Sequence, residues 1–237
     1  MVPGAEIPSE SLADRLETVQ QSVADAVRDA GRDPADVTTI VVTKFHPAQL
    51  VRDLYALGVR EFGESRHQEA LAKAGELDDL GDLDWHFIGQ LQSKKARQAR
   101  SYARVIHSVD RGSLVDALAG GDIAEGEPPV DVFVQVNLTD DATRGGVVVA
   151  ELDSFVERVL GTSGLRLLGL MTVAPLGEAP RPAFETLRTL SESVQRSAPD
   201  ARMLSMGMSG DYREAILEGA THLRIGTAIT GNRPSHG

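Results

Sequence analysis

The sequence predicts an α/β fold, a single (β/α)8 TIM barrel with an extra helix at its N-terminus. Helical and strand-like apolar spacings alternate from about residue 10 to the end, giving one leading helix and then eight strand–helix units. The composition does not shift along the 237 residues, and α/β barrels of this length often form one domain. We therefore expect one domain over residues 1–237. A doubly wound open sheet is the alternative, because a single sequence does not show whether a sheet closes.

The first half of the chain alternates between the two spacings. Apolar residues three and four positions apart mark the helices, which end at glycines such as Gly31 and Gly58, and short apolar runs rich in β-branched residues mark the strands. The expected elements are a helix over 12–27, a strand over 40–42, a helix over 50–57, a strand over 59–62, a helix over 68–74, a strand over 85–88, a polar helix over 93–100 and a strand over 105–109.

The second half repeats the pattern. Gly120-Gly121 closes its first helix, the run from Val130 to Val136 is its clearest strand, and Pro128-Pro129 and Pro180 fit loops. The expected elements are a helix over 114–118, a strand over 130–136, a helix over 152–160, a strand over 165–173, a helix over 183–195, a strand over 203–205, a helix over 212–217 and a strand over 222–225.

Composition excludes several classes of function. The chain has no cysteine, which rules out disulfides, thiol catalysis and cysteine-based zinc or iron–sulfur sites. Its net charge of −11 argues against a general nucleic-acid binder or a protein of anionic membranes. No signal peptide or membrane-spanning run is evident, so we expect a soluble, cytoplasmic protein whose residues 1–8 form a flexible N-terminus.

Lys44 is the first candidate for chemistry. Only four of the 24 basic residues are lysines, and this one stands at the end of the first strand, directly before Phe45. Arginine keeps its proton near neutral pH, whereas a partly desolvated lysine can lose it and form a Schiff base. Taken alone, Lys44 fits a strand-end lysine that reaches into solvent better than a reactive one.

The predicted barrel gives Lys44 polar neighbours. Active sites of such barrels lie at the C-terminal ends of the strands, although each residue found there also has an ordinary structural explanation. The candidates at these ends are Lys44, Glu64, Ser65, Arg66, His86, His107, Asn137, Thr172, the run from Ser205 to Ser209, Arg224, Gly226 and Thr227.

The last two strand ends predict a phosphate site. Ser205 to Ser209 is a small-residue loop that opens a helix, and Gly226-Thr227 leaves free backbone N–H groups after the final strand. Because the eighth strand neighbours the first in a closed barrel, a phosphorylated aldehyde bound there could reach Lys44. Pyridoxal 5′-phosphate (PLP) has both groups. Arg224 would face the ring nitrogen and keep it unprotonated, which would weaken the ring as an electron sink.

Seven stretches of the chain, which extend over nearly its whole length, carry a family resemblance. They are VVTKFHP at 41–47, EFGESRHQEA at 61–70, WHFIGQLQSKK at 85–95, IHSVDR at 106–111, GLMTVAP at 169–175, LSMGMSGDYREAI at 204–216 and LRIGTAITG at 223–231. With them the sequence resembles the pyridoxal phosphate homeostasis proteins, which look like the barrel domain of alanine racemase standing alone, a fold-type III PLP-binding barrel.

The resemblance assigns roles to individual residues. It implies that Lys44 holds PLP as a Schiff base and that Arg224 lies near the pyridine nitrogen. The other expected cofactor contacts are Ser205, Ser209, Gly226 and Thr227 at the phosphate, together with Met206, Asn137 and His86. The chain departs from the family pattern at three positions, with Ser65 and Lys94 where asparagine is usual and Arg144 where lysine is usual.

Three functions fit this set of residues. The first is a cytoplasmic, monomeric carrier or buffer of PLP that is not an enzyme and whose partners are apo forms of PLP-dependent enzymes. The second is an amino-acid racemase of the alanine racemase type. That reaction needs a second acid/base, a tyrosine that racemases take from an added β-domain, whereas Tyr55, Tyr102 and Tyr212 fall in predicted helices and the sequence ends at Gly237. The third is a phosphosugar enzyme with Glu64 as base. We expect the carrier.

Overall fold

The computed structural model describes residues 10–120, 128–141 and 143–232. The predicted flexible segment 1–8 and the predicted helix end at Gly121 lie outside these residues.

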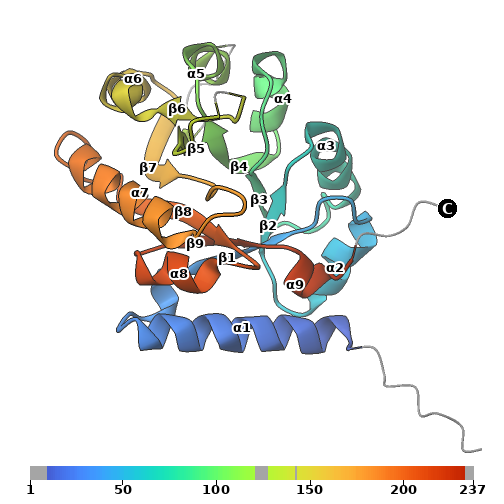
Figure 1. Cartoon of the computed structure of the whole chain (residues 1–237). Coiled ribbons are helices and arrows are strands. Elements are labelled where there is room, and N and C mark those ends of the chain that lie inside the picture. The colour runs from blue at the N-terminus through green and yellow to red at the C-terminus, as the bar shows by residue number, and fades with distance from the viewer. Residues whose placement is uncertain (1–9, 121–127, 142, 233–237) are drawn as a thin grey trace, which may run out of the picture.

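Eight parallel strands close into a barrel (Figure 1). Around the barrel each strand pairs with the next in chain order, β4 pairs with β5, and β9 returns to β1. The barrel strands are β1 (Thr38–Val42), β2 (Glu61–Glu64), β3 (Asp84–Phe87), β4 (Ala103–Val109), β5 (Val130–Asn137), β7 (Leu165–Met171), β8 (Met203–Met208) and β9 (His222–Ile225). The predicted (β/α)8 barrel is therefore confirmed, and the open-sheet alternative is excluded.

The helices form the outer layer of the barrel (Figure 1). They are α1 (Leu12–Asp29), α2 (Ala48–Ala56), α3 (His67–Glu76), α4 (Ala96–Arg100), α5 (Gly112–Ala119), α6 (Leu152–Leu160), α7 (Arg181–Val194), α8 (Tyr212–Leu217) and α9 (Thr227–Thr230). Short 3-10 turns occupy Pro34–Asp36, Ser93–Lys95 and Val149–Glu151. Most of the buried apolar side chains lie between the strands and this layer, where they form the main core.

The leading helix α1 is the extra N-terminal element. It begins with a capping box in which Ser11 and Asp14 each bond the other's backbone N–H. Its apolar stripe is buried, and it packs across α8 and α9. Arg15 fixes its position by donating to the carbonyl oxygen of Ile229 at 2.8 Å.

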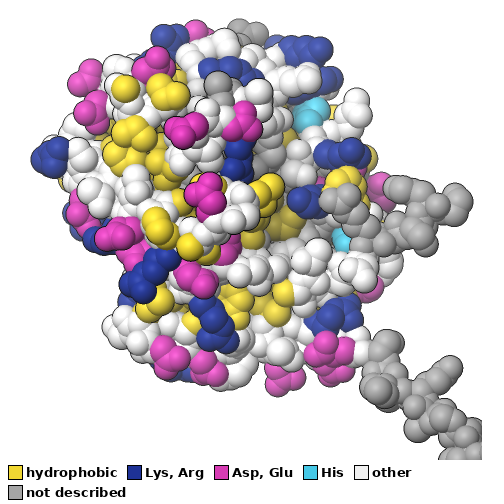
Figure 2. All heavy atoms as spheres, viewed as in Figure 1, with side chains coloured by type: hydrophobic (Ala, Val, Ile, Leu, Met, Phe, Trp, Pro, Cys, Tyr) yellow, Lys and Arg dark blue, Asp and Glu magenta, His cyan; other side chains and the backbone are white. Residues whose placement is uncertain are grey.

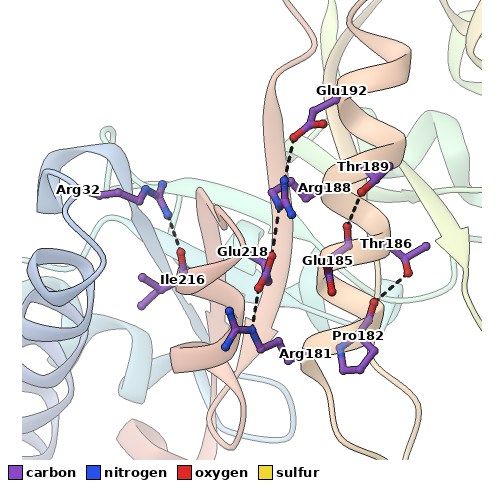
Figure 3. A network of polar contacts seen from close by, with 10 residues as sticks. All are labelled: Arg32, Arg181, Pro182, Glu185, Thr186, Arg188, Thr189, Glu192, Ile216 and Glu218. Carbon is purple, nitrogen blue, oxygen red and sulfur yellow. Dashed lines mark hydrogen bonds and ion pairs between the residues drawn. The ribbon is translucent and has the colours of Figure 1, made fainter.

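Glu218, at the end of α8, joins α8 to α7 (Figure 3). Its buried carboxylate accepts from Arg181 Nε at 2.8 Å and from Arg188 Nε at 3.2 Å, both on α7. Because a buried carboxylate is costly without partners, these contacts hold the two helices together.

β8 differs most from the prediction. It continues to Met208, whereas the sequence suggested a strand that stops at Ser205. The extension follows from pairing with β9, where Met208 lies opposite Arg224. Gly207 makes it possible, because its φ is +93° and an added Cβ would lie 2.7 Å from the Cβ of Ala215 on α8. Glycine has a low strand propensity, but the close packing of α8 against position 207 requires it there.

Other differences are smaller. β2 begins two residues later than predicted, and the two-residue strand β6 (Val147–Val148), which pairs with β5, was missed. Tyr102 lies in the turn between α4 and β4, not in a helix.

Acidic and basic side chains are interspersed on the face shown in Figure 2. Over the part of the chain that the structure describes, every helix is too short or too polar to cross a membrane.

Candidate functional site

Lys44 lies just beyond β1, at the C-terminal rim of the barrel. The register of β1 with β9 pairs Val41 with Ile225, and a Cβ added to Gly226 would lie 3.5 Å from the Cβ of Val42. Lys44 therefore adjoins the turn that begins at Gly226. Its side chain is half-buried, and no hydrogen bond or ion pair joins its ammonium to any residue in the described ranges.

The turn after Lys44 is strained. Phe45 has a φ of +68°, the one non-glycine residue with positive φ among those described. Such a conformation costs about 1 to 3 kcal/mol and persists where surrounding contacts impose it. Here Glu69 of α3 accepts the Phe45 N–H through Oε2 at 3.1 Å, and the Arg66 guanidinium lies over the Phe45 ring at 4.8 Å. Contacts from the start of α3 thus fix the turn that carries Lys44.

A buried ion pair supports the residue before Lys44. Lys73 of α3 donates to the carbonyl oxygen of Thr43 at 2.8 Å and to Glu64 Oε1 at 2.5 Å. The Thr43 hydroxyl donates to the same oxygen at 2.8 Å. Burial raises the pKa of the Glu64 carboxyl, against the opposing charge of Lys73. Glu64 therefore anchors the strand end through Oε1, whereas its Oε2 is buried and has no hydrogen-bond partner among the described residues.

Backbone N–H groups gather at the ends of β8 and β9. The Ser209 hydroxyl oxygen accepts from Gly226 N–H at 3.3 Å and from Ala228 N–H at 3.5 Å. Thr227, between them, has an exposed side chain at the start of α9. The N–H groups of Gly226 and Ala228 thus converge on one point, where the hydroxyl side chains of Ser209 and Thr227 are also available. We call these groups the phosphate cradle, because they suit a phosphate oxygen. Together with the unpaired amine of Lys44, these groups fit a phosphorylated aldehyde such as PLP.

Arg224 brings a buried positive charge close to the rim. Its Nη2 donates to the carbonyl oxygen of Thr172, just past the end of β7, at 2.9 Å, and its Nη1 donates to the Ser205 hydroxyl at 2.7 Å. Burial lowers the pKa of Arg224 to about 10, while nearby Asp211 acts in the opposite direction. The guanidinium therefore stays charged at neutral pH.

Two of the predicted cofactor contacts lie inside β8. The side chain of Ser205 is fully buried, and its hydroxyl bonds His107 Nδ1 at 2.8 Å as well as Arg224. Met206 is also fully buried and belongs to the apolar core beneath the helices. Both side chains are thus held within β8, and their contacts with the cofactor stay predictions.

His86 and Asn137 are likewise engaged elsewhere. His86 is buried in the barrel between Glu61 Oε2 at 2.6 Å and His107 Nε2 at 2.9 Å. The amide of Asn137 holds its own loop, donating to the carbonyl oxygen of Asp141 at 3.0 Å and accepting from Thr139 N–H at 3.0 Å. Their contacts with the cofactor also stay predictions.

Glu69 and Lys73 were missed by the sequence analysis. The scarcity of lysine could have drawn attention to Lys73, whereas nothing in the sequence marks Glu69. Of the three departures from the family pattern, Ser65 lines a hollow of about 490 Å³ at the start of α3. Lys94 lies in the turn Ser93–Lys95, and Arg144 donates to the carbonyl oxygen of Ala174 at 3.5 Å.

Comparisons with known proteins agree with this architecture. Residues 16–234 match the family model of the alanine racemase N-terminal domain. A pyridoxal phosphate homeostasis protein of Pseudomonas aeruginosa is 42% identical over 226 residues, which cover 94% of this chain and 96% of the relative. The Escherichia coli protein of the same name is 36% identical over 228 residues, covering 94% and 97%.

Solved structures are also similar. PipY of Synechococcus elongatus, solved with PLP bound, has a TM-score of 0.81 and 38% identity, and the match covers 93% of this chain and all of PipY. Alanine racemase of Corynebacterium glutamicum has a TM-score of 0.67 at 18% identity, covering 94% of this chain and 62% of the racemase. This second likeness shows a shared fold.

Proposed function

Since the chain belongs to the pyridoxal phosphate homeostasis protein family, we propose that it binds PLP at the barrel rim and keeps it available inside the cell. The observation that carries the proposal is that Lys44, whose amine has no partner among the described residues, follows β1, while the N–H groups of Gly226 and Ala228 follow the neighbouring strand β9. The family model extends over residues 16–234 without a break, which supports a single binding domain.

Different residues would bind the two ends of the ligand, the aldehyde and the phosphate. Lys44 Nζ would form a C=N bond with the aldehyde carbon and release water, which makes a Schiff base. Ser209, Gly226 and Thr227 would hold the phosphate through hydroxyl and N–H groups. The orientation of the ring then follows from these two fixed ends.

Arg224 would set the electronic state of the ring. When bound, PLP supplies an electron-withdrawing pyridine ring. A guanidinium that keeps its proton opposes a second positive charge on the pyridine nitrogen, and so weakens electron withdrawal. Such a site suits holding the cofactor better than using it for carbanion chemistry.

The carrier function is favoured over the racemase. The curated relatives are named for homeostasis and not for a reaction. All three tyrosines bond other side chains: Tyr55 bonds Asp82, Tyr102 bonds His67, and Tyr212 bonds Ser22. A two-base racemisation would need an acid/base side chain facing Lys44 across the substrate.

Absorbance spectroscopy tests the proposal. The purified protein mixed with PLP should show the visible band of a Schiff base, and Lys44→Ala should lack it. Lys95→Ala, which removes another lysine, is the matched control and should keep the band. A wild-type protein that stays colourless and takes up no PLP would contradict both the carrier function and the racemase function.

The finer parts of the proposal need their own measurements. Racemisation of alanine by the PLP-loaded protein at enzymatic rates would replace the carrier by the racemase. Delivery to an apo enzyme should activate that enzyme faster than the same amount of free PLP, and an equal rate would count against delivery. A cytoplasmic location and a monomeric state stay predictions, to be checked by cell fractionation and analytical ultracentrifugation.

A further inference from the structure

A chain of polar side chains runs through the interior of the barrel, where such folds mostly pack apolar layers. Glu61 Oε2 lies 2.6 Å from His86 Nε2, and His86 Nδ1 lies 2.9 Å from His107 Nε2. His107 Nδ1 lies 2.8 Å from Ser205 Oγ, which accepts from Arg224 Nη1 at 2.7 Å. Each member thus contacts the next within hydrogen-bond distance.

The chain crosses the barrel from end to end. Glu61 is the first residue of β2, at the N-terminal end of the barrel, and its side chain is 35% exposed. His86, His107 and Ser205 are buried. Arg224 completes the path by reaching the carbonyl oxygen beyond the end of β7, at the opposite rim.

The two ends fix the direction of the hydrogen bonds. Arg224 can only donate, and an ionised Glu61 can only accept. The hydrogen bond from His86 holds the pKa of the Glu61 carboxyl below its usual range, so this end is ionised at neutral pH. Burial lowers the pKa of His107 well below its usual value, so that imidazole is neutral.

One order of protons then satisfies every contact. Glu61 accepts from His86 Nε2–H, His86 Nδ1 accepts from His107 Nε2–H, and His107 Nδ1 accepts the Ser205 hydroxyl proton. Ser205 accepts in turn from Arg224. If His86 carried a second proton, on Nδ1, His107 Nε2 would accept it, and neutral His107 would have to donate to Ser205 through Nδ1. The Ser205 hydroxyl proton would then have no acceptor among these polar side chains. An unpaired buried hydroxyl is costly, which disfavours that order.

We propose that Glu61, His86, His107 and Ser205 are positioning residues for Arg224, linked by one fixed order of protons with both imidazoles protonated on Nε2. These four side chains hold one edge of the Arg224 guanidinium. Because the guanidinium is planar, its remaining N–H donors then point toward the rim. The role of Arg224 toward a ligand rests on the proposed function, whereas the proton order does not.

Nitrogen NMR of the histidines, in the protein without PLP, tests the proton order. Both His86 and His107, assigned from the signals lost in His86→Gln and His107→Gln, should show a protonated Nε2 and an unprotonated Nδ1 at pH 7.5. An Nδ1-protonated tautomer at either residue, or an imidazolium, would overturn the proposal.

Ser205→Ala tests the link to Arg224, with Ser108→Ala as the matched control. Ser108 is also fully buried, but its hydroxyl has no partner among the described residues. Ser205→Ala should shift the His107 nitrogen signals, weaken PLP binding about tenfold as a charged hydrogen bond is lost, and move the visible band of bound PLP. Ser108→Ala should change none of these.

The outcomes separate the two proposals. Equal behaviour of the two serine variants in NMR and in binding would refute the positioning role. Failure of the wild-type protein to bind PLP would sink the proposed function, and the NMR result would still decide the proton order.

Discussion

His222 should make the protein acid-sensitive over a defined pH range. It is buried at the start of β9, where its ring meets Phe133 edge-on at 5.1 Å between centroids and its Nδ1 lies 2.9 Å from the Thr221 hydroxyl. Burial lowers the pKa of His222 to about 4; nearby Arg224 acts in the same direction and Glu61 opposes. The imidazole is therefore neutral in the folded protein at neutral pH.

The sign of the effect follows from linkage. In the unfolded chain the group takes up its proton near pH 6.5, whereas in the folded protein it does so near pH 4. Its contribution to the free energy of unfolding is thus fully present above pH 6.5 and is lost as the pH falls toward 4. Between pH 8 and pH 5.5 the loss is about 1.4 kcal/mol.

Urea unfolding of the wild type and of His222→Gln at these two pH values measures the loss. The variant does not titrate here, so the stability difference between the two proteins should be about 1.4 kcal/mol smaller at pH 5.5 than at pH 8. Both values stay above the isoelectric point near 5.0, where the protein would tend to precipitate.

Phe133→Leu is the control, since it disturbs the same contact without titrating. Phe133→Leu should lower the free energy of unfolding by the same amount at both pH values. A stability difference for His222→Gln that does not change between pH 8 and pH 5.5 would refute the assigned burial of this imidazole.

Three further predictions concern the strands and the rim. Gly169→Ala should destabilise the protein by at least about 3 kcal/mol in urea unfolding, because its φ is +155° and a Cβ would lie 1.8 Å from a β8 carbonyl oxygen. Gly75→Ala, with open space around it in α3, should instead stabilise it by about 0.5 to 1 kcal/mol; equal effects would contradict the packing described. Ser209→Ala should weaken PLP binding more than it lowers stability, and an unchanged Kd would remove Ser209 from the phosphate cradle. Glu69→Ala removes an acceptor of the Phe45 N–H, so it should lower the free energy of unfolding by about 1 kcal/mol and weaken PLP binding. Unchanged PLP binding would show that the contact between Glu69 and Phe45 does not support the site.

The barrel was predictable because its elements leave a local record. Alternating apolar spacings in sequence gave the strands and helices within a few residues, and eight such units favoured closure. Lys44 and Gly226 were placed on the rim by the same reasoning, since each lies within two residues of the end of a strand.

The errors have a common physical cause. The length of β8 depends on pairing with β9 and on the fit of Gly207 against α8, neither of which a local pattern records. The position of Ser205 inside the barrel follows from that length. The strained conformation of Phe45 depends on Glu69, 24 residues further along the chain. Local spacing thus predicts elements, whereas the partners of buried polar groups emerge when distant segments meet.

Borohydride reduction tests the central claim, that Lys44 is the residue that holds PLP. Reduction converts the C=N bond of a Schiff base into a stable amine, and peptide mass mapping then locates it. We predict that the added pyridoxyl group lies on the peptide containing Lys44 and is absent from Lys44→Ala. A group found on Lys73, Lys94 or Lys95, or on no lysine at all, would contradict the account.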